Sequence, residues 1–401
     1  MGLELIKTDF LIIGAGIIGL AIGKTLRDLY PQRDICIVEK EPSLGVHSSG
    51  RNSGVLHAGF YYTPDSLKAK FTRLGNYELT RFCEERGLKI NKCGKVVIAR
   101  NEKELEILKE LKRRGEANGV ELYLITEKEL REIEPGAKTY RYAIWSPSTA
   151  TVEPLEILKT LEKELKEKEI RIFYSTPYEK VLKNEKKVMA GRNVFIVERI
   201  INCAGLYADR IAKDFGFSKD YEIVPFKGLY LEYSGNDNFI KTNLYPVPDI
   251  TFPFLGVHFT VTVNGKIKIG PTAIPVFSRE NYKGLKGLKL KEILRAFKWN
   301  WKLAVNNAEF RRLAVEEIKK YNKKFLIKQA GLLVKTIPDA RWFSWSKPGI
   351  RAQLIDIRNL RLVQDFLVEG DGYSTHILNA VSPAFTASLP FARYVVENYI
   401  K

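Results

Sequence analysis

Residues 8–41 read TDFLIIGAGIIGLAIGKTLRDLYPQRDICIVEKE. An apolar run leads into glycines, a helical pattern follows and ends near Pro31, and a second apolar run comes after it. This order predicts strand, glycine turn, helix and strand, which together form one βαβ unit. Within GAGIIG, we expect Gly14 to permit a tight turn, Gly16 to let phosphates approach the backbone, and Gly19 to allow close helix–strand packing.

An acidic residue stands at the end of the second predicted strand. Glu39, in ICIVEKE, follows the glycines at about the 20-residue distance at which a carboxylate can hold a ribose hydroxyl pair. A glycine match alone would be weak, but this combination indicates a dinucleotide site. FAD and NAD share a free ribose, so the fingerprint does not choose between them.

Length and composition indicate a globular chain with two domains. A chain of 401 residues suits two cores of ordinary size, and no stretch reaches the roughly 18 uncharged apolar residues of a membrane span. The N-terminus lacks the order of a signal peptide, so a cytoplasmic location is expected. The four cysteines form no CxxC pair, so we expect neither a metal site nor a disulfide framework.

The net charge of +18 is compatible with several partners: nucleic acid, anionic lipid or an acidic substrate. The excess is lysine scattered among glutamates, as in heat-adapted proteins, so we interpret most of it as solvated surface. The basic segment 284–334 carries Trp299 and Trp301. It could lie peripherally on the inner face of an anionic membrane, or equally pack its tryptophans into the core.

The rest of the chain alternates between predicted helices and strands. Residues 43–64 form a loop rich in Gly, Ser, Asn and aromatic residues, where a polar ligand could bind. Apolar residues at helical spacing predict helices at 66–87, 101–117, 153–168, 284–334 and 382–399, and after a capping box of Thr126 and Glu129. Strands are predicted between 171 and 205, in a separate antiparallel sheet over 221–270, and from Gly349.

Several segments together resemble one enzyme superfamily. GAGIIG with Glu39, RIINCAGLYAD at 199–209, GIRAQ at 349–353 and NAVSPAFTASLP at 379–390 resemble FAD enzymes of the D-amino-acid oxidase and glycerol-3-phosphate dehydrogenase superfamily. Longer segments resemble L-2-hydroxyglutarate dehydrogenases and oxidases: HSSGRNSGVLHAGFYYTPDSLKAK at 47–70, VPFKGLYL at 224–231, NLYPVPDITFPFLGVHFT at 243–260, GPTAIPVFSRENY at 270–282, GIRAQLID at 349–356 and LVQDFLV at 362–368. The resemblance spans nearly the whole chain. It departs at Arg51, where relatives often have histidine, and in the basic helical region.

The resemblance implies FAD as the cofactor and a discontinuous FAD-binding domain. The fold class is α/β, with a Rossmann-like FAD-binding domain over 1–82, 150–220 and 346–401. A second α+β domain for the substrate, built on an antiparallel sheet, comprises 83–149 and 221–345. FAD contacts are expected from Gly14, Gly16, Gly19, Glu39, Lys40, Ser48, Asn52, Ser53, Gly54, Val55, Ala204, Gly205, His376, Asn379, Ser382 and Ala384. The last three precede the final helix, whose free N–H groups suit negative charge on reduced flavin; the alternative is an ordinary helix cap at Ser382.

The reaction implied is oxidation of a 2-hydroxy acid, L-2-hydroxyglutarate to 2-oxoglutarate, with hydride passing to flavin and a base taking the hydroxyl proton. The chain has four histidines, the side chain suited to base work near neutrality. His258 is the first candidate, and its alternative role is a strand histidine bonded to a backbone carbonyl. We expect His57 to line the site beside noncovalent FAD, His376 to support the flavin, and His47 to be structural.

A substrate carboxylate calls for a bidentate arginine. Arg351 of GIRAQ corresponds by resemblance to the arginine that binds the substrate carboxylate in amino-acid-oxidising relatives; its alternative is a surface or helix-capping role. Candidates for the second carboxylate are Lys227, Tyr61, Tyr62 and Arg51, and their order stays open.

Other functions compete with this one. The same fold could oxidise glycerol 3-phosphate, amino acids or amines, although VPDITFPFLGVHFT at 247–260 argues against them. The charge also suggests a flavin-containing nucleic-acid-binding protein, but no RNA-binding motif supports it, and no nucleic-acid partner is expected. The electron acceptor, quinone or oxygen, does not follow from the sequence.

Overall fold

The computed structural model describes residues 4–235, 237–249, 255–284, 287–288 and 290–400. The chain divides into two compact units, each assembled from separate stretches. The first comprises Met1–Arg51, Pro154–Ile223 and Ala352–Lys401; the second comprises Asn52–Glu153 and Val224–Arg351. Part of the segment that carries the resemblance, residues 250–254, lies outside the described residues.

The largest difference from the predicted boundaries concerns residues 52–82, which belong to the second unit. The short strand β3 (Val55–Leu56) pairs there with β8 (Ala150–Val152). Helix α2 (Leu67–Glu85) is joined to β3 and to the turn before β8, because Asn76 Nδ2 donates hydrogen bonds to the carbonyl oxygens of Leu56 and Ser148. These contacts are distant in sequence, so a local pattern could not place the segment.

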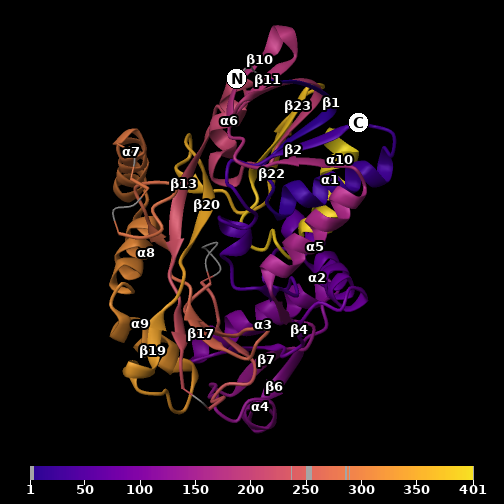
Figure 1. Ribbon diagram of the computed structural model, residues 1–401. Coiled ribbons are helices and arrows are strands. Elements are labelled where there is room, and N and C mark those ends of the chain that lie inside the picture. The colour runs from indigo at the N-terminus through magenta and orange to yellow at the C-terminus, as the bar shows by residue number, and fades with distance from the viewer. Residues whose placement is uncertain (1–3, 236, 250–254, 285–286, 289, 401) are drawn as a thin grey trace. The chain divides into compact units, whose positions relative to one another are not determined.

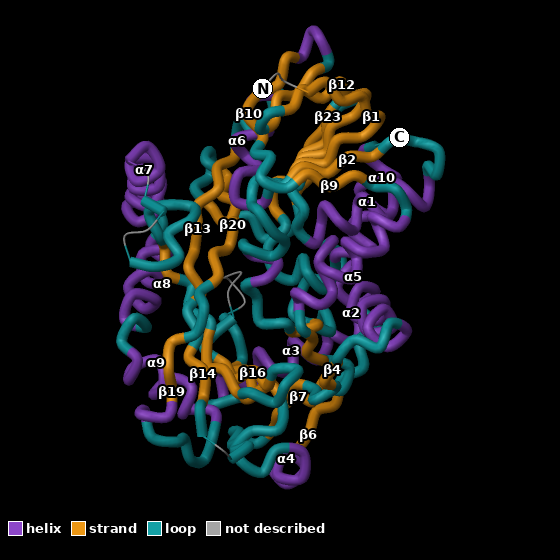
Figure 2. The backbone as a smooth tube through the Cα atoms, in the orientation of Figure 1, coloured by secondary structure: helices purple, strands orange, loops and turns teal. Residues whose placement is uncertain are grey.

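The first unit is built on a sheet centred on β1 (Glu4–Ile13). This strand runs parallel to β2 (Ile35–Val38) on one side and to β12 (Asn193–Asn202) on the other, as Figures 1 and 2 show. The strand order is β10–β11–β12–β1–β2–β9, and β23 also pairs with β12. The outer strands are β9 (Arg171–Phe173), β10 (Tyr178–Leu182), β11 (Lys187–Ala190), β22 (Leu367–Gly370) and β23 (Ser374–Asn379).

Helix α1 (Ile17–Leu29) connects β1 to β2 and contacts α5 (Pro154–Glu167) and α10 (Ser388–Tyr399). The predicted βαβ unit is therefore present. Helix α10 begins later than predicted, because residues 382–387 form turns in place of the first helical residues. The unit is completed by α6 (Ala208–Asp214) and β21 (Arg361–Leu362).

The second unit contains an eight-stranded sheet in the order β19–β14–β17–β16–β15–β5–β7–β6. Its strands are β5 (Lys95–Ile98), β6 (Tyr123–Thr126), β7 (Tyr142–Ser146), β14 (Leu231–Tyr233), β15 (Asn243–Pro246), β16 (His258–Val261), β17 (Ile267–Gly270) and β19 (Phe343–Trp345). The predicted antiparallel sheet is corrected at one pair, since β15 and β5 run parallel. A local pattern could not predict this parallel pairing, because β5 ends at Ile98 and β15 begins only at Asn243.

Helices pack apolar side chains against this sheet. Leu105, Leu108 and Leu111 of α3 (Glu102–Ala117) join Val97 of β5 in one core cluster. Leu326 of α9 (Lys323–Ala330) belongs to a second cluster. The capping box predicted at Thr126 and Glu129 is confirmed at the start of α4 (Glu127–Ile133).

The remaining elements of the second unit are β4 (Ile90–Asn91), β18 (Ile274–Pro275), α7 (Leu290–Asn306) and α8 (Ala308–Lys319). Strands β13 (Tyr221–Gly228) and β20 (Gly349–Asp356) contain the points at which the chain passes between units. Among the described residues, no helix combines the length and the apolar character needed to cross a membrane.

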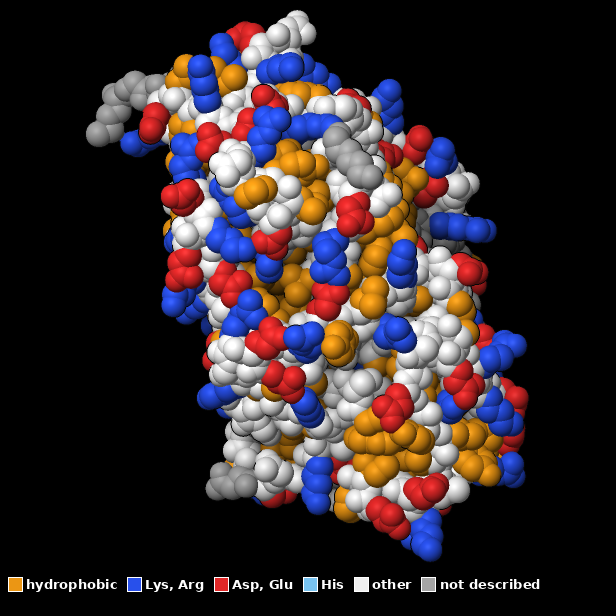
Figure 3. Space-filling model, turned by 90° about the vertical axis from the view of Figure 1, so that its right-hand side faces the viewer, with side chains coloured by type: hydrophobic (Ala, Val, Ile, Leu, Met, Phe, Trp, Pro, Cys, Tyr) orange, Lys and Arg blue, Asp and Glu red, His pale blue; other side chains and the backbone are white. Residues whose placement is uncertain are grey.

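The surface supports the interpretation of the charge excess as solvated lysine and arginine. On the face in Figure 3, Lys and Arg side chains are interspersed with Asp and Glu. Many exposed pairs lie one helical turn apart, such as Lys24 with Asp28 and Arg81 with Glu85. Such pairs contribute little stability individually.

Candidate active site

The glycine turn of the first unit brings backbone groups closer together than side chains would permit. Gly14 has φ +106°, and a Cβ there would lie 2.7 Å from the carbonyl oxygen of Cys203. A Cβ on Gly19 would lie 2.0 Å from the carbonyl oxygen of Gly14. Helix α1 therefore starts directly against β1, and glycine is required at both positions.

The N-terminus of α1 has features of a phosphate-binding site. Gly16 is the N-cap and carries no side chain, and Ile17 N–H donates to Ser49 Oγ at 3.0 Å. Glu39, which directly follows β2, accepts a hydrogen bond from Ala15 N–H at 2.9 Å. A helix N-terminus beside a carboxylate fits the pyrophosphate and ribose of a dinucleotide. Ser49 was missed in favour of Ser48, which begins a short 3-10 turn over Ser48–Gly50.

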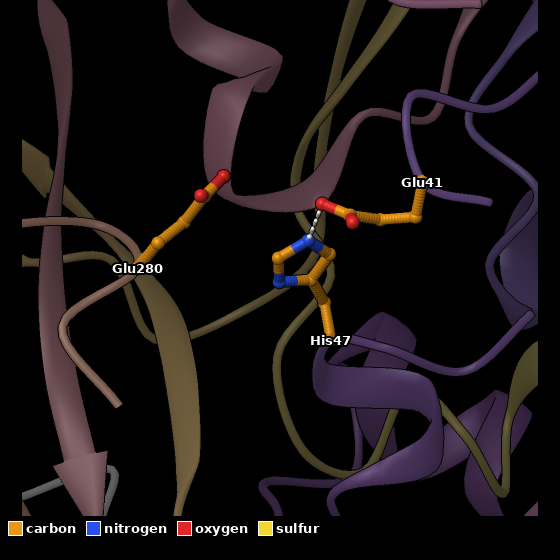
Figure 4. A group of neighbouring side chains, drawn as sticks. All are labelled: Glu41, His47 and Glu280. Carbon is orange, nitrogen blue, oxygen red and sulfur yellow. Dashed lines mark hydrogen bonds and ion pairs between the residues drawn. The ribbon is translucent and has the colours of Figure 1, made fainter. Parts of the chain in front are cut away.

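Lys40, a predicted FAD contact, lies in an ionic cluster beside this turn. Glu41 pairs with Lys40 and with His47, whose Nε2 is 2.8 Å from Glu41 Oε1 (Figure 4). Burial would raise the pKa of Glu41, but the hydrogen bonds from Lys40 and His47 outweigh it and lower this pKa. His47 therefore holds the conformation of the loop, as expected of a structural histidine.

His376 is a core residue of the first unit, and its support of the flavin stays a prediction. Its Nδ1 lies 3.1 Å from Asn202 Nδ2, and its Nε2 lies 3.1 Å from Ser374 Oγ. Phe215 and Phe217 contact the ring, which is fully buried, and burial lowers its pKa to about 4. The Nδ1 contact joins β23 to β12, whereas the Nε2 contact lies within β23.

The Asn379 side chain also bonds within the first unit, and its contact with FAD stays a prediction. Its side chain donates to the carbonyl oxygens of Val363 and Asp365 and accepts from Leu354 N–H, so it fixes neighbouring backbone. Ser382 and Ala384 precede α10 within a turn, and α10 is capped at Ala387.

The remaining predicted cofactor contacts lie in two loops. Ala204 N–H donates to Asn202 Oδ1, and Gly205, at φ +52°, begins a 3-10 turn directly after β12. In the second unit, Asn52 Oδ1 accepts from Gly54 N–H at 2.9 Å, and Gly54 has φ +72°. Ser53 lies between them, and Val55 is buried in β3. These loops present backbone and small side chains, as a nucleotide-binding surface requires.

In the second unit, the register of the sheet brings together the side chains of Lys95, Tyr245 and His258. Leu244 of β15 lies opposite Phe259 of β16, so Tyr245 and His258 form the next cross-strand pair. Their rings stack with centroids 3.7 Å apart. Lys95 of β5 lies opposite Asn243, two residues before Tyr245, and therefore faces the same side of the sheet.

His258 is a buried, neutral histidine with a defined tautomer. Its Nδ1 lies 2.8 Å from the Gly256 carbonyl oxygen, which can only accept, so the ring proton resides on Nδ1. Nε2 then carries a lone pair. Burial, together with the positive charges of Lys95 and Arg351, lowers the pKa of His258 to about 3. The backbone contact that was named as the alternative role of His258 is therefore present, and it fixes the tautomer of the ring.

His57 and Tyr61 meet beside Lys95, whose Nζ is 3.5 Å from His57 Nδ1 and 5.2 Å from the centre of the Tyr61 ring. Burial lowers the pKa of His57 well below its usual value and raises that of Tyr61 well above its own. The Tyr61 hydroxyl is buried without a hydrogen-bond partner among the described residues. Lys95 was not predicted as a site residue. Its segment KVVI is rich in β-branched residues, which favour a strand but do not indicate a functional lysine.

Arg351 and Lys227 are brought together around Thr272. Arg351 Nη1 donates to the Thr272 carbonyl oxygen at 2.9 Å, and Thr272 Oγ1 donates to the Lys227 carbonyl oxygen at 2.9 Å. Lys227 Nζ donates to Asn281 Oδ1, and burial lowers the pKa of Lys227. Thr272 thus contacts the backbone of Lys227 and the side chain of Arg351, and both of these residues carry a cationic group of the kind that binds an acidic ligand.

The other two candidates for the second carboxylate are Arg51 and Tyr62, which remain predictions. Arg51 Nε donates to the Val46 carbonyl oxygen at 2.6 Å, inside the loop of the first unit. The Tyr62 ring lies under Lys68 Nζ, 5.8 Å from it. Tyr230 was not singled out from the sequence. Burial raises the pKa of Tyr230, and the positive charge of nearby Arg351 opposes this increase.

Comparison with known proteins extends these observations over the whole chain. Residues 9–397 match the model of the FAD dependent oxidoreductase family. The chain is 35% identical to the mitochondrial L-2-hydroxyglutarate dehydrogenase of Caenorhabditis briggsae, over 99% of this chain and 94% of that protein. It is 32% identical to L-2-hydroxyglutarate dehydrogenase of Escherichia coli K12, over 97% and 92%. The fold resembles FAD-bound L-α-glycerophosphate oxidase from Mycoplasma pneumoniae, with TM-score 0.76, 23% identity and coverage of 98% and 94%.

Proposed function

The chain belongs to the family of FAD-dependent oxidoreductases that act on CH–OH donors, and we propose that it oxidises L-2-hydroxyglutarate to 2-oxoglutarate. The observation that carries this proposal is the similarity, along nearly the full length, to enzymes named for that substrate. The predicted L-2-hydroxyglutarate dehydrogenase resemblance and the FAD cofactor are thereby confirmed.

FAD would be held by the glycine turn and by Glu39. The positive end of the α1 dipole suits the pyrophosphate, and the Glu39 carboxylate suits the ribose hydroxyl pair. When bound, the flavin supplies the hydride acceptor of the reaction. The remaining steps fall to side chains that bind the acid, orient its hydroxyl and take one proton.

We assign the proton-accepting step to His258. Its Nδ1–H is held by the Gly256 carbonyl oxygen, so Nε2 is unprotonated and can receive the substrate hydroxyl proton. Because burial keeps His258 neutral at physiological pH, no prior deprotonation is needed. The low basicity that burial imposes would be relieved by the negative charge of the bound acid, which stabilises a protonated histidine.

We assign the substrate carboxylate next to the carbinol carbon to Arg351. Its guanidinium donates through Nη1 to the Thr272 carbonyl oxygen, and the planar shape of a guanidinium suits a carboxylate. The positive charge of Arg351 lowers the pKa of His258. This interaction supports a single site in which Arg351 binds the carboxylate and His258 accepts the proton. Lys227, buried next to the same threonine, is the best placed candidate for the second carboxylate.

A panel of purified substrates tests this function through its product. The FAD-loaded enzyme is given an artificial electron acceptor with L-2-hydroxyglutarate, its D enantiomer, glycerol 3-phosphate, glycine or L-proline. We expect 2-oxoglutarate from the L-hydroxy acid at a kcat/KM at least about a hundredfold above that of any other compound. Preference for glycerol 3-phosphate or an amino acid would replace the proposal by the corresponding oxidase.

We further propose that the electrons pass to a membrane quinone, with α7 and α8 on an anionic lipid surface. Leu290, Leu294, Phe297, Trp301 and Val305 form one stripe along α7 and are 55–72% exposed. Val315 and Ile318 of α8 are exposed as well. Basic residues flank the stripe, and Lys298 and Lys302 lie over the Trp299 ring. A basic amphipathic helix with exposed aromatics suits the lipid interface.

Sedimentation with vesicles tests the membrane surface. We expect the enzyme to pellet with phosphatidylglycerol vesicles at low salt and weakly with phosphatidylcholine, and Trp301→Glu to abolish pelleting. The control is Tyr77→Glu, which adds the same charge at an equally exposed aromatic residue of α2. Equal pelleting of both variants, or none by the wild type, would favour oxygen or a protein as the acceptor.

A further inference from the structure

Lys95 is a fully buried lysine that the assignments above leave without a role. Its ammonium lies over the ring of Tyr245, 4.3 Å from the centroid, and near the rings of Phe60 and Tyr61. Among the described residues, no carboxylate forms an ion pair with it. Burial of an ammonium group costs several kcal/mol, so an unpaired one is retained at a cost in stability.

The titratable groups that face Lys95 come from each element packed around it. Cys93 precedes it on the same segment, His57 and Tyr61 lie on the loop after β3, Tyr245 lies on β15, and His258 on β16. All of them are neutral at pH 7, because burial raises the pKa of the cysteine and the tyrosines and lowers that of the histidines. Lys95 is therefore the one group of this set that can carry charge near neutrality.

The Nδ1 atoms of the two histidines have opposite partners. His258 Nδ1 faces a carbonyl oxygen, which accepts only, whereas His57 Nδ1 faces an ammonium, which donates only. A neutral imidazole has one proton, so the partner of Nδ1 decides the state of Nε2. His258 then has a lone pair on Nε2, and His57 has a proton on Nε2.

We propose that Lys95 is a positioning residue, whose ammonium fixes His57 as the Nε2–H tautomer and thereby makes His57 a hydrogen-bond donor to the substrate. The two histidines thus have separate tasks. His258 accepts the hydroxyl proton, and His57 donates a hydrogen bond to an oxygen of the acid and steadies the charge that develops there. This division of roles rests on the proposed function, whereas the tautomers themselves do not.

The charge on Lys95 makes the tautomer of His57 dependent on pH. Burial lowers the pKa of Lys95 to about 7. Below that pH the ammonium can only donate to His57 Nδ1; above it the neutral amine can also accept, and the constraint is lifted. The tautomer of His258 depends on a backbone carbonyl and should not change over the same range.

Nitrogen-15 NMR of the histidine rings in the FAD-loaded chain tests this directly, since there are only four histidines. Spectra of His57→Gln and His258→Gln assign the signals. At pH 6 we expect His57 as Nε2–H and His258 as Nδ1–H. Lys95→Met should remove the preference of His57 alone, and Lys95→Arg, which keeps a donor, should preserve it. The control is Lys266→Met, an exposed lysine of the same unit that pairs with Glu232.

The proposal is overturned if His57 carries its proton on Nδ1 in the wild type, or if Lys95→Met leaves its tautomer unchanged. Should Lys95→Met fail to fold, titration of the wild type from pH 6 to pH 8.5 decides, because the His57 ratio must then change through about pH 7. For the folded variant we expect kcat/KM for L-2-hydroxyglutarate to fall by about a hundredfold, as for loss of one oriented donor. Failure of the wild type to oxidise that acid would refute the proposed function and leave the tautomers to the NMR result.

Discussion

Replacing Gly19 by alanine tests the cofactor site at its tightest point. The new Cβ would lie 2.0 Å from the Gly14 carbonyl oxygen, and ordinary contact begins at 3.4 Å, so the gap must open by 3.4 − 2.0 = 1.4 Å. This overlap involves backbone, which cannot rotate away as a side chain could. Helix α1 must therefore move from β1 and carry its N-terminal N–H groups with it.

Overpacking of this kind costs about 1–3 kcal/mol. If the overpacking destabilises the FAD complex by about 2 kcal/mol relative to the apoprotein, the Kd for FAD rises roughly 30-fold, because about 1.4 kcal/mol corresponds to a tenfold change in Kd. Titration of the apoprotein with FAD, followed by flavin fluorescence, measures this. The control is Gly372→Ala in the same unit, where the added Cβ meets no atom within 4 Å. If Gly19→Ala binds FAD within about threefold of the control, α1 does not hold the pyrophosphate.

Three further predictions concern single side chains. His258→Gln should lower kcat/KM by about 10²–10⁴-fold with FAD retained, and a loss below tenfold would remove His258 as the base. Arg351→Lys should raise KM for L-2-hydroxyglutarate at least about tenfold, because a fork is lost, and an unchanged KM would assign the carboxylate elsewhere. The pKa of His376 is lowered to about 4 in the folded chain, whereas it has its ordinary value in the unfolded chain. As the pH falls from that ordinary value toward 4, the unfolded chain therefore binds a proton that the folded chain does not, and the folded state loses stability. Between pH 7 and pH 5 this histidine should cost the wild type about 2 kcal/mol of unfolding free energy in urea titrations. The unfolding free energy of His376→Gln should therefore fall less between pH 7 and pH 5 than that of the wild type. An equal fall in both proteins would contradict the lowered pKa of His376.

The first unit was largely predictable, because its determinants are local. The glycines, the helix and Glu39 lie within one short segment, and the spacing of apolar residues follows directly from strand and helix geometry. The capping box at Thr126 is equally local. The start of α10 was placed too early, because turn residues before Ser388 continue the helical pattern of apolar positions.

The candidate site in the second unit was only partly predictable, because pairing between distant segments builds it. His57, His258 and Arg351 could be named from their residue type and the resemblance. Lys95 could not, since a lysine at the start of a strand ordinarily faces solvent, and only the parallel pairing of β5 with β15 places it against Tyr245. The contact of His376 with Asn202 was not predictable for the same reason, because it depends on the pairing of β12 with β23.

Anaerobic titration of the FAD-loaded enzyme with the two enantiomers of 2-hydroxyglutarate tests the central claim most directly, because it needs no electron acceptor. We expect one equivalent of the L enantiomer to bleach the visible absorbance of the flavin and to yield one equivalent of 2-oxoglutarate, while the D enantiomer leaves the absorbance unchanged. An oxidised spectrum that persists with excess L-2-hydroxyglutarate would contradict the account.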